Sequence, residues 1–224
     1  MILRKKKIIT IDGPSGAGKS TIAKLLASKA GYTYIDSGAI YRGIAYAYKI
    51  RKNGASLEEL LGDLPLTFDF GKNTRVELSG RDISEEIRKP DISLLASSLS
   101  QEPSVREYAN SVQRRLATDR DAVLEGRDTG SVVFPDADIK FYLDAHPGER
   151  ANRRYTELAS KGSQTELDTV REEMEKRDTD DSTRAVAPLI VPEGAIIIDT
   201  TGKDIEAVLK TILAHIKDRG GQEK

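Results

Sequence analysis

The sequence contains no cysteine and no tryptophan, and it has only two histidines and two methionines. Without cysteine, the chain can form neither a disulfide nor a thiolate metal site. The histidines, His146 and His215, lie far apart, and neither belongs to a spacing typical of zinc ligands. The composition therefore argues against thiol chemistry and against a zinc centre.

Long hydrophobic runs are also missing. The first apolar run, Ile8 to Ile11, ends at Asp12, and no other stretch approaches the length of a membrane span. The net charge of −1 gives no overall attraction to nucleic acid or to a membrane surface. From its 224 residues we expect one large domain, or one domain with an insertion. We expect a cytoplasmic monomer that acts on small molecules, with no nucleic-acid partner.

One motif organises the chain. An apolar run is followed by a glycine-rich loop and then by a helix-like run, in the pattern G-x-x-x-x-G-K-[ST] of a P-loop. Such a loop turns its backbone N–H groups toward phosphate oxygens, and the following helix directs the positive end of its dipole at them. We expect Lys19 to reach the β- and γ-phosphates and the Ser20 hydroxyl to ligate Mg²⁺. The predicted triphosphate-binding residues are Gly13, Pro14, Ser15, Gly16, Ala17, Gly18, Lys19, Ser20 and Thr21.

The alternative to a P-loop is an ordinary glycine-rich turn before a helix. The strand, every fixed position of the motif and the helix are all present, so we favour the P-loop. We expect Lys19→Ala to abolish turnover but not folding, because we place this side chain outside the core. The motif predicts a bound nucleoside triphosphate but does not say what its energy or phosphate is used for.

The wider pattern predicts an α/β fold with a parallel sheet and helices on both faces, because apolar strands alternate with helices. The expected strands are Ile8–Asp12, Tyr32–Ile35, Ala122–Leu124, Ile139–Leu143 and Ala195–Asp199. The expected helices are Ser20–Ala30, Ala39–Arg51, Ile92–Leu99, Pro103–Thr118, one from Pro147 that ends before Gly162, Gln164–Arg177 and Asp204–Lys217. We expect Asp178–Arg184 to be a polar loop.

Between Leu57 and Pro90 the pattern changes to a hairpin-rich insert. Short strands are expected at Leu64–Phe70 and Arg75–Leu78, with turns at Gly71–Asn73 and Gly80–Asp82. We interpret this stretch as a small subdomain.

Arginines suggest a second phosphate site. Arg42, Arg106, Arg127, Arg177 and Arg184 all lie near predicted strand ends, loops or helix ends. Guanidinium groups pair bidentately with phosphate, so several that converge would hold a monophosphate in line with the γ-phosphate. A solvated surface role is the alternative for each of them. Asp128 and Asp181 could accept from a base or a ribose, or could cap a helix.

The arginines of the helix from Pro147, namely Arg150, Arg153 and Arg154, admit two interpretations. They could belong to a lid that closes over the triphosphate, or to a basic solvated helix face.

Four stretches, taken together, are highly specific. They are Ile9–Lys19, Asp36-Ser37-Gly38-Ala39-Ile40-Tyr41-Arg42, Gly126-Arg127-Asp128 with Val132–Ala137, and Arg184-Ala185-Val186-Ala187-Pro188-Leu189. In this combination the sequence resembles the bacterial cytidylate kinases, within the nucleoside monophosphate (NMP) kinases, over nearly its whole length. Glu125 stands where we associate an Asp with the family, and Asp178–Arg184 is more acidic than usual.

The resemblance implies a P-loop kinase fold: a five-stranded parallel sheet flanked by helices, a small β-containing NMP-binding insert and a helical lid. We expect a single domain, with a core at about 1–38, 103–146 and 186–224, an NMP-binding region at 39–102 and a lid at 147–185. The implied reaction transfers phosphate from Mg²⁺–ATP to CMP or dCMP.

The resemblance also implies roles for individual residues. Ser37, Arg42, Arg106 and Arg127 match the CMP-binding set, with the three arginines on the phosphate, and Tyr41 lies beside them. Ser97, Asp128 and Arg184 match the cytosine-binding residues, and Asp181 with Arg177 matches the ribose contact. The predicted catalytic residues are Lys19, Arg150, Arg153 and Arg154.

Two rival functions remain. A GTPase-like switch would carry an Asn-Lys-x-Asp guanine motif, but the nearest stretch, Arg88-Lys89-Pro90-Asp91, lacks the Asn and follows no predicted strand. A kinase for another small metabolite would differ only in its acceptor, which the fold does not decide.

Overall fold

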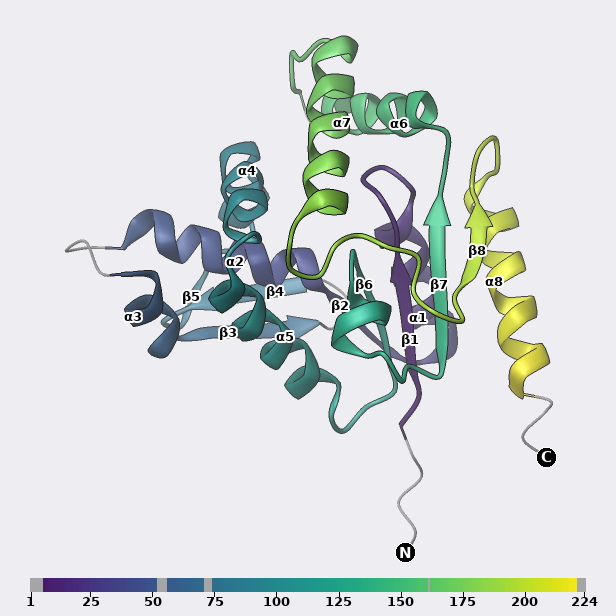
Figure 1. The fold of residues 1–224 in the computed structure, drawn as a ribbon, viewed down its shortest axis with the longest axis horizontal. Helices are drawn as coiled ribbons and strands as arrows, with labels where there is room; N and C mark the ends of the chain where they lie inside the picture. Colours follow the sequence, from purple (N-terminus) through teal and green to yellow (C-terminus); the bar gives the residue numbers. More distant parts are fainter. Residues whose placement is uncertain (1–5, 52–55, 71–73, 161, 221–224) are drawn as a thin grey trace, which may run out of the picture.

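A computed structural model describes residues 6–51, 56–70, 74–160 and 162–220. Its centre is a five-stranded sheet in the order β2-β6-β1-β7-β8, and all neighbouring strands in it run parallel (Figure 1). The strands are β1 (Ile8–Asp12), β2 (Thr33–Asp36), β6 (Ala122–Gly126), β7 (Ile139–Asp144) and β8 (Ile196–Asp199). The predicted α/β class and all five predicted strands are confirmed.

Helices cover both faces of this sheet. Helices α1 (Lys19–Ala30) and α8 (Ile205–Gly220) pack on one face, where Leu26 and Ile212 are fully buried against Phe141. Helices α2 (Ser37–Ile50), α4 (Pro90–Leu99) and α5 (Pro103–Ala117) belong to the core of the other face. Successive residues of one strand, such as Val123 and Leu124, enter opposite cores, as the alternation of side chains along a strand requires.

A separate antiparallel sheet forms the insert, from β3 (Leu66–Phe70), β4 (Thr74–Leu78) and β5 (Arg81–Asp82). The predicted turn at 71–73 lies outside the described residues. The predicted turn at Gly80–Asp82 is shifted, because Arg81 and Asp82 pair with Leu78 and Glu77. Leu66 and Val76 are buried in the same core as α2, so the insert supports that helix.

The helix α3 (Leu57–Gly62) lies at the start of the insert, before its sheet, and was not expected from the sequence. Its capping box is complete: the Ser56 hydroxyl accepts from Glu59 N, and the Glu59 carboxylate accepts from Ser56 N.

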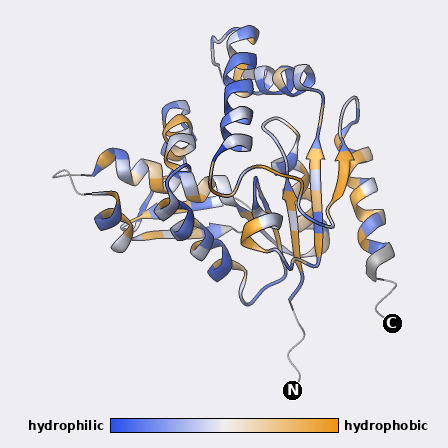
Figure 2. Cartoon of the chain, in the orientation of Figure 1, coloured by the Kyte–Doolittle hydropathy of each residue, from blue (hydrophilic) through white to orange (hydrophobic). Residues whose placement is uncertain are grey.

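Two helices, α6 (Pro147–Ser160) and α7 (Leu167–Thr183), lie beyond the carboxyl ends of the central strands (Figure 1). Both are largely hydrophilic, whereas the strands below them are largely hydrophobic (Figure 2). The expected loop at Asp178–Arg184 is wrong, since α7 continues to Thr183. Hydroxyls of Thr179, Ser182 and Thr183 bond to carbonyls one turn earlier, and Asp181 is buried.

Thr129–Val133 form a short π-helical turn after β6. Within the described ranges, no helix is both long and apolar enough to cross a bilayer.

Candidate active site

The P-loop lies between the end of β1 and the start of α1, and glycine makes its path possible. A Cβ on Gly13 would lie 2.0 Å from the Leu143 carbonyl oxygen, so only glycine lets the loop pass this close to β7. Gly16 has a φ of 74°, in the left-handed region. The first N–H groups of α1 have no partner within the helix and face the loop. Such an arrangement at a helix N-terminus is suited to binding an anion.

Lys19 is buried, contrary to the expectation that its side chain lies outside the core. It is 5% exposed, and its Nζ donates to Pro14 O at 2.6 Å. Burial, with a further contribution from nearby Arg127, lowers the pKa of Lys19 to about 7. The ammonium is therefore poorly compensated until an anion arrives.

Ser20 and Glu125 form an oxygen-rich pair at the end of the P-loop. The hydroxyls of Ser20 and Tyr34 both donate to Glu125 Oε1, at 2.7 and 3.0 Å. Ser20 was predicted from the sequence as a metal ligand, whereas Glu125 was assigned no role. Glu125 lies near the P-loop because β6 pairs with β1, and the sequence does not specify that pairing.

Hydroxyl and carboxylate oxygens suit Mg²⁺, which usually takes few protein ligands and completes its shell with water and substrate phosphate. Across the described ranges, no cluster of three or more His, Cys, Asp or Glu residues could hold a metal. Ser20 and Glu125 therefore fit a nucleotide-bound magnesium ion rather than a protein-enclosed one.

A single cavity of about 1290 Å³ joins the P-loop to the arginine side. Gly13, Pro14 and Arg150 do not line it. It is lined by the other predicted site residues: Ser15, Gly16, Ala17, Gly18, Lys19, Ser20, Thr21, Ser37, Tyr41, Arg42, Ser97, Arg106, Arg127, Asp128, Arg153, Arg154, Arg177, Asp181 and Arg184. Residues separated by more than 160 positions in the chain thus meet around one space.

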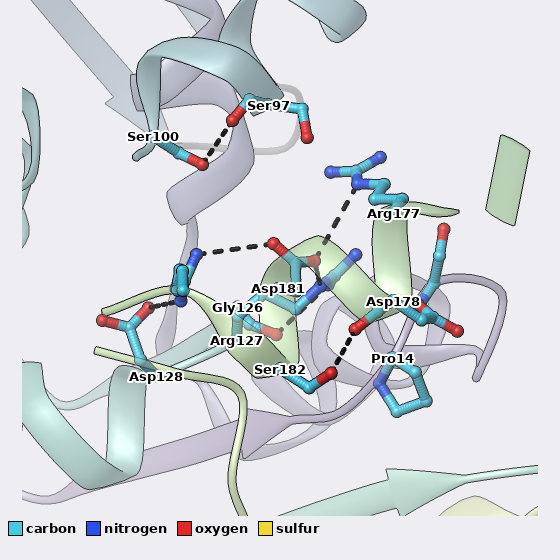
Figure 3. A network of polar contacts seen from close by, with 12 residues as sticks. Pro14, Ser97, Ser100, Gly126, Arg127, Asp128, Arg177, Asp178, Asp181 and Ser182 are labelled. Atoms are coloured by element: carbon cyan, nitrogen blue, oxygen red, sulfur yellow. Dashed lines mark hydrogen bonds and ion pairs between the residues drawn. The ribbon is translucent and has the colours of Figure 1, made fainter. Parts of the chain in front are cut away.

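Two buried carboxylates organise the arginines. Asp128 pairs with Arg106 and, at 3.5 Å, with Arg184. Asp181 accepts from Arg127 Nε at 2.9 Å and Arg184 Nη1 at 3.4 Å, and it lies 4.0 Å from Arg177 Nε (Figure 3).

The arginines also set the charge of Asp181. Burial alone raises its pKa, but Arg127, Arg177 and Arg184 together hold it below the ordinary value. This carboxylate is therefore charged at neutral pH.

Several buried donors of this arginine cluster make no hydrogen bond. Within the described residues, buried N–H groups of Arg42, Arg106, Arg177 and Arg184 have no hydrogen-bond partner, and neither has the hydroxyl of Tyr41. The Tyr41 ring lies 5.7 Å from the Arg106 guanidinium. Buried donors without partners are costly, so the cluster is suited to an anionic ligand that accepts from them.

Ser37 and Arg42 lie on the first turns of α2. The Asp36 carboxylate caps this helix by accepting from Ala39 N at 2.9 Å, and it also pairs with Arg42 at 3.2 Å. The Ser37 hydroxyl donates to Glu125 O at 2.7 Å.

The loop after β6 is held by a buried acid of β1. Asp12 accepts from the backbone N and hydroxyl of Thr129 and from Gly130 N, at 2.7 to 2.9 Å. This fixes the loop that carries Arg127 and Asp128. The role of Asp12 could not be predicted from the sequence, because its partners lie more than 110 residues away.

The three arginines of α6 that the sequence singled out, Arg150, Arg153 and Arg154, separate in space. Arg153 donates to the Thr200 hydroxyl and carbonyl, at 2.9 and 2.7 Å, and Arg154 pairs with Glu157 at 2.8 Å. Both line the cavity. Arg150 lies behind the P-loop, bonded to Ala145 O and Ser15 O.

Comparison with known proteins agrees with this geometry. Residues 9–218 match the family described as cytidylate kinase. A cytidylate kinase of Caldanaerobacter subterraneus is 48% identical over 212 residues, covering 93% of this chain and 94% of that protein. A cytidylate kinase of Geobacter sulfurreducens is 44% identical over 221 residues, covering 96% and 95%. A shikimate kinase structure from Bacteroides thetaiotaomicron shares the fold, with a TM-score of 0.51 at 14% identity over 94% of this chain and 98% of that one. The chain therefore belongs to the cytidylate kinase family.

Proposed function

We propose that the protein transfers the γ-phosphate of ATP to CMP or dCMP, giving ADP and CDP or dCDP. The observation that carries this proposal is the shared cavity. It has the P-loop at one end and, at the other, arginines with buried N–H groups that lack hydrogen-bond partners among the described residues. Two phosphate groups bound at these ends would face each other, as in-line transfer requires. We further propose that the enzyme acts as a cytoplasmic monomer.

In this proposal the triphosphate lies on the P-loop, with Lys19 at its β- and γ-phosphates. Arrival of the anion would restore the full charge of Lys19, which burial disfavours in the free protein. Ser20 and Glu125 would hold Mg²⁺, which neutralises phosphate charge when bound with the nucleotide.

The acceptor phosphate would take the unused donors of Arg42 and Arg106, together with Arg127. Their positions are fixed before the acceptor binds: Arg42 by Asp36, Arg106 by Asp128 and Arg127 by Asp181. Such preorganisation, with charge neutralisation, supplies most of the catalysis in phosphoryl transfer. Arg153 and Arg154 lie on the cavity and are the lid arginines that we assign to the transferring phosphoryl group. For Arg150 to serve there, its bonds to Ser15 and Ala145 would have to break.

Recognition of the base is assigned to Asp128, Arg184 and Ser97, and recognition of the ribose to Asp181 with Arg177. A carboxylate accepts from the exocyclic amine of cytosine. Uracil presents a carbonyl oxygen at this position, which a buried charged carboxylate would repel. The cavity should therefore favour cytosine over uracil.

The test is a coupled ADP-release assay with ATP and Mg²⁺, offering CMP, dCMP, UMP, AMP and GMP separately. We expect rapid turnover with CMP and dCMP only. Ser97→Ala should raise KM for CMP, whereas Ser98→Ala should not, because Ser98 is an exposed neighbour that does not line the cavity.

Rapid turnover with another monophosphate would keep the phosphate site and overturn the base assignment. No acceptor-dependent ADP from folded protein would refute the proposed reaction. Competition between ATP and GTP for binding separates this proposal from a GTPase-like switch.

A further inference from the structure

The two helices of the proposed lid, α6 and α7, hold the P-loop through side-chain contacts to its backbone. On α6, Arg150 is 8% exposed, and its guanidinium donates to Ser15 O at 2.9 Å and to Ala145 O at 3.0 Å. On α7, Asp178 accepts from Ser15 N at 3.2 Å. Asp178 also pairs with Arg150. Both polar backbone groups of Ser15 are thus bonded to lid side chains, and we name Ser15, Arg150 and Asp178 the Ser15 clamp.

The residue after Ser15 makes this close approach possible. A Cβ on Gly16 would lie 2.7 Å from Arg150 O and 2.9 Å from Met174 Cε. The loop backbone therefore packs directly against both lid helices. The clamp thus combines close backbone packing with hydrogen bonds and is more than a single ion pair. It places Arg150 away from the cavity, in contact with the loop that would hold the triphosphate.

The helix α7 also reaches the acceptor side of the cavity. Asp181 lies three residues after Asp178, on the same side of α7, and it accepts from Arg127 Nε at 2.9 Å (Figure 3). Arg177 and Asp178 are adjacent, so one helical turn carries a P-loop contact and two acceptor-side groups. A rigid turn that moved away from Ser15 would also move Asp181 away from Arg127.

We infer that the Ser15 clamp couples the two nucleotide sites, with Asp178 and Arg150 as positioning residues. This inference rests on the proposed function. A bound triphosphate favours one conformation of the P-loop. Through the clamp, α7 is held in contact with the loop in that conformation. A bound acceptor favours the position of α7 in which Asp181 meets Arg127. Each nucleotide therefore tightens binding of the other, by the same factor in both directions.

The test measures this coupling factor directly by isothermal titration calorimetry. The affinity for CMP is measured alone and in the presence of saturating Mg²⁺ and a non-hydrolysable ATP analogue, and the coupling factor is the ratio of the two. We expect about fivefold or more in the wild-type protein. Asp178→Asn and Asp178→Ala should bring the factor close to one, and Asp178→Glu should restore part of it. The affinity for CMP alone should change much less.

Asp180→Asn is the matched control, because Asp180 is an exposed acid on the same helix, two residues further on. It should keep the wild-type factor. Arg150→Lys gives a second route if the Asp178 variants fail to fold, since one ammonium cannot reproduce the contacts of the guanidinium with Ser15 O, Ala145 O and Asp178. It should also lower the factor.

The results distinguish failure of the clamp hypothesis from failure of the proposed function. CMP binding by wild-type protein together with an unchanged coupling factor in the folded variants would refute the clamp and leave the proposed function standing. The absence of coupling in the wild type would refute it as well. If wild-type protein binds no CMP at all, the proposed function fails first.

Discussion

Replacing Lys19 with Met should abolish turnover and stabilise the nucleotide-free protein. The side chain is 5% exposed, and its pKa is lowered to about 7 by burial, then by nearby Arg127. In the unfolded chain the lysine keeps its ordinary pKa of 10.5. Between these two values the unfolded state binds a proton that the folded state has lost. The stability contributed by this group therefore rises as pH rises from about 7 to 10.5, and its cost is greatest below pH 7.

The magnitude follows from the two pKa values. A difference of 1.36 kcal/mol per pKa unit makes the cost of a charged Lys19 about 4 kcal/mol at pH 7. Methionine fills the space of the lysine methylenes and removes this cost. It also removes the donor to Pro14 O, and an unpaired carbonyl costs about 1–3 kcal/mol. The net gain should be about 1–3 kcal/mol, and each kcal/mol raises Tm by ~2–4 °C in a protein of this size.

Calorimetry at pH 7 and pH 10, without nucleotide and with a chelator, measures the gain. It should shrink at pH 10, where the lysine of the unfolded chain is losing its proton as well. Lys29→Met is the control: Lys29 is exposed on the same helix, and its replacement should change stability by less than about 0.5 kcal/mol. Turnover of Lys19→Met should fall by about 10²–10³-fold or more. A variant less stable than wild type at pH 7, or a gain that persists at pH 10, would refute the reasoning.

Three further predictions concern other parts of the fold. Burial raises the pKa of Asp12 to about 6, although the hydrogen bonds from Gly130 and Thr129 lower it in part. Between about pH 4 and 6 the folded state therefore retains a proton that the unfolded state loses. Urea unfolding should show stability falling as pH rises through this window, and Asp12→Asn should flatten the profile. Gly16→Ala should lower the free energy of unfolding by about 1–3 kcal/mol, because its Cβ meets Arg150 O at a φ of 74°; a variant of wild-type stability would contradict this. Leu66→Ala should cost about 2–5 kcal/mol in denaturant unfolding. It should also raise KM for CMP more than KM for ATP, because Leu66 packs beside Gly43 of α2, the helix that carries Arg42; equal changes in the two constants would argue against this.

The central fold could be predicted because its signals are local. Each strand of the parallel sheet is a short apolar run, and the P-loop motif fixes the turn between β1 and α1. The strand order could not be predicted in the same way. Ile9 pairs with Val123 on one side and Ile139 on the other, and no local pattern specifies partners more than 110 residues away.

Two errors in helix prediction have different causes. The helix α3 carried a readable signal, because Ser56 and Glu59 have the spacing of a capping box. The last turn of α7 carried none, since Asp, Ser and Thr favour turns over helix interiors. Its stability comes from tertiary contacts, above all the pairing of Asp181 with Arg127 of the loop after β6. No propensity argument contains that partner.

The same distinction applies to the site. The P-loop residues form a contiguous motif, and all five arginines that the sequence places near element ends line one cavity. Glu125, Asp12 and Asp178 were given no role, because an isolated acid has no spacing pattern. Their importance depends on partners contributed by other elements: Ser20 for Glu125, Thr129 for Asp12 and Ser15 for Asp178.

The acids of the cavity explain how so many arginines can share it. Like charges in a partly buried space repel, and each arginine would otherwise be driven toward solvent. Asp181 alone faces Arg127, Arg177 and Arg184, so it holds three guanidinium groups near the positions that a nucleotide would use. A phosphate that binds here would meet donors that are already aligned, so its binding would require little rearrangement of the side chains. The same carboxylates repel a phosphate that lies closer to them than to the arginines. One set of charges therefore both positions the arginines and restricts the binding modes that a phosphate can adopt.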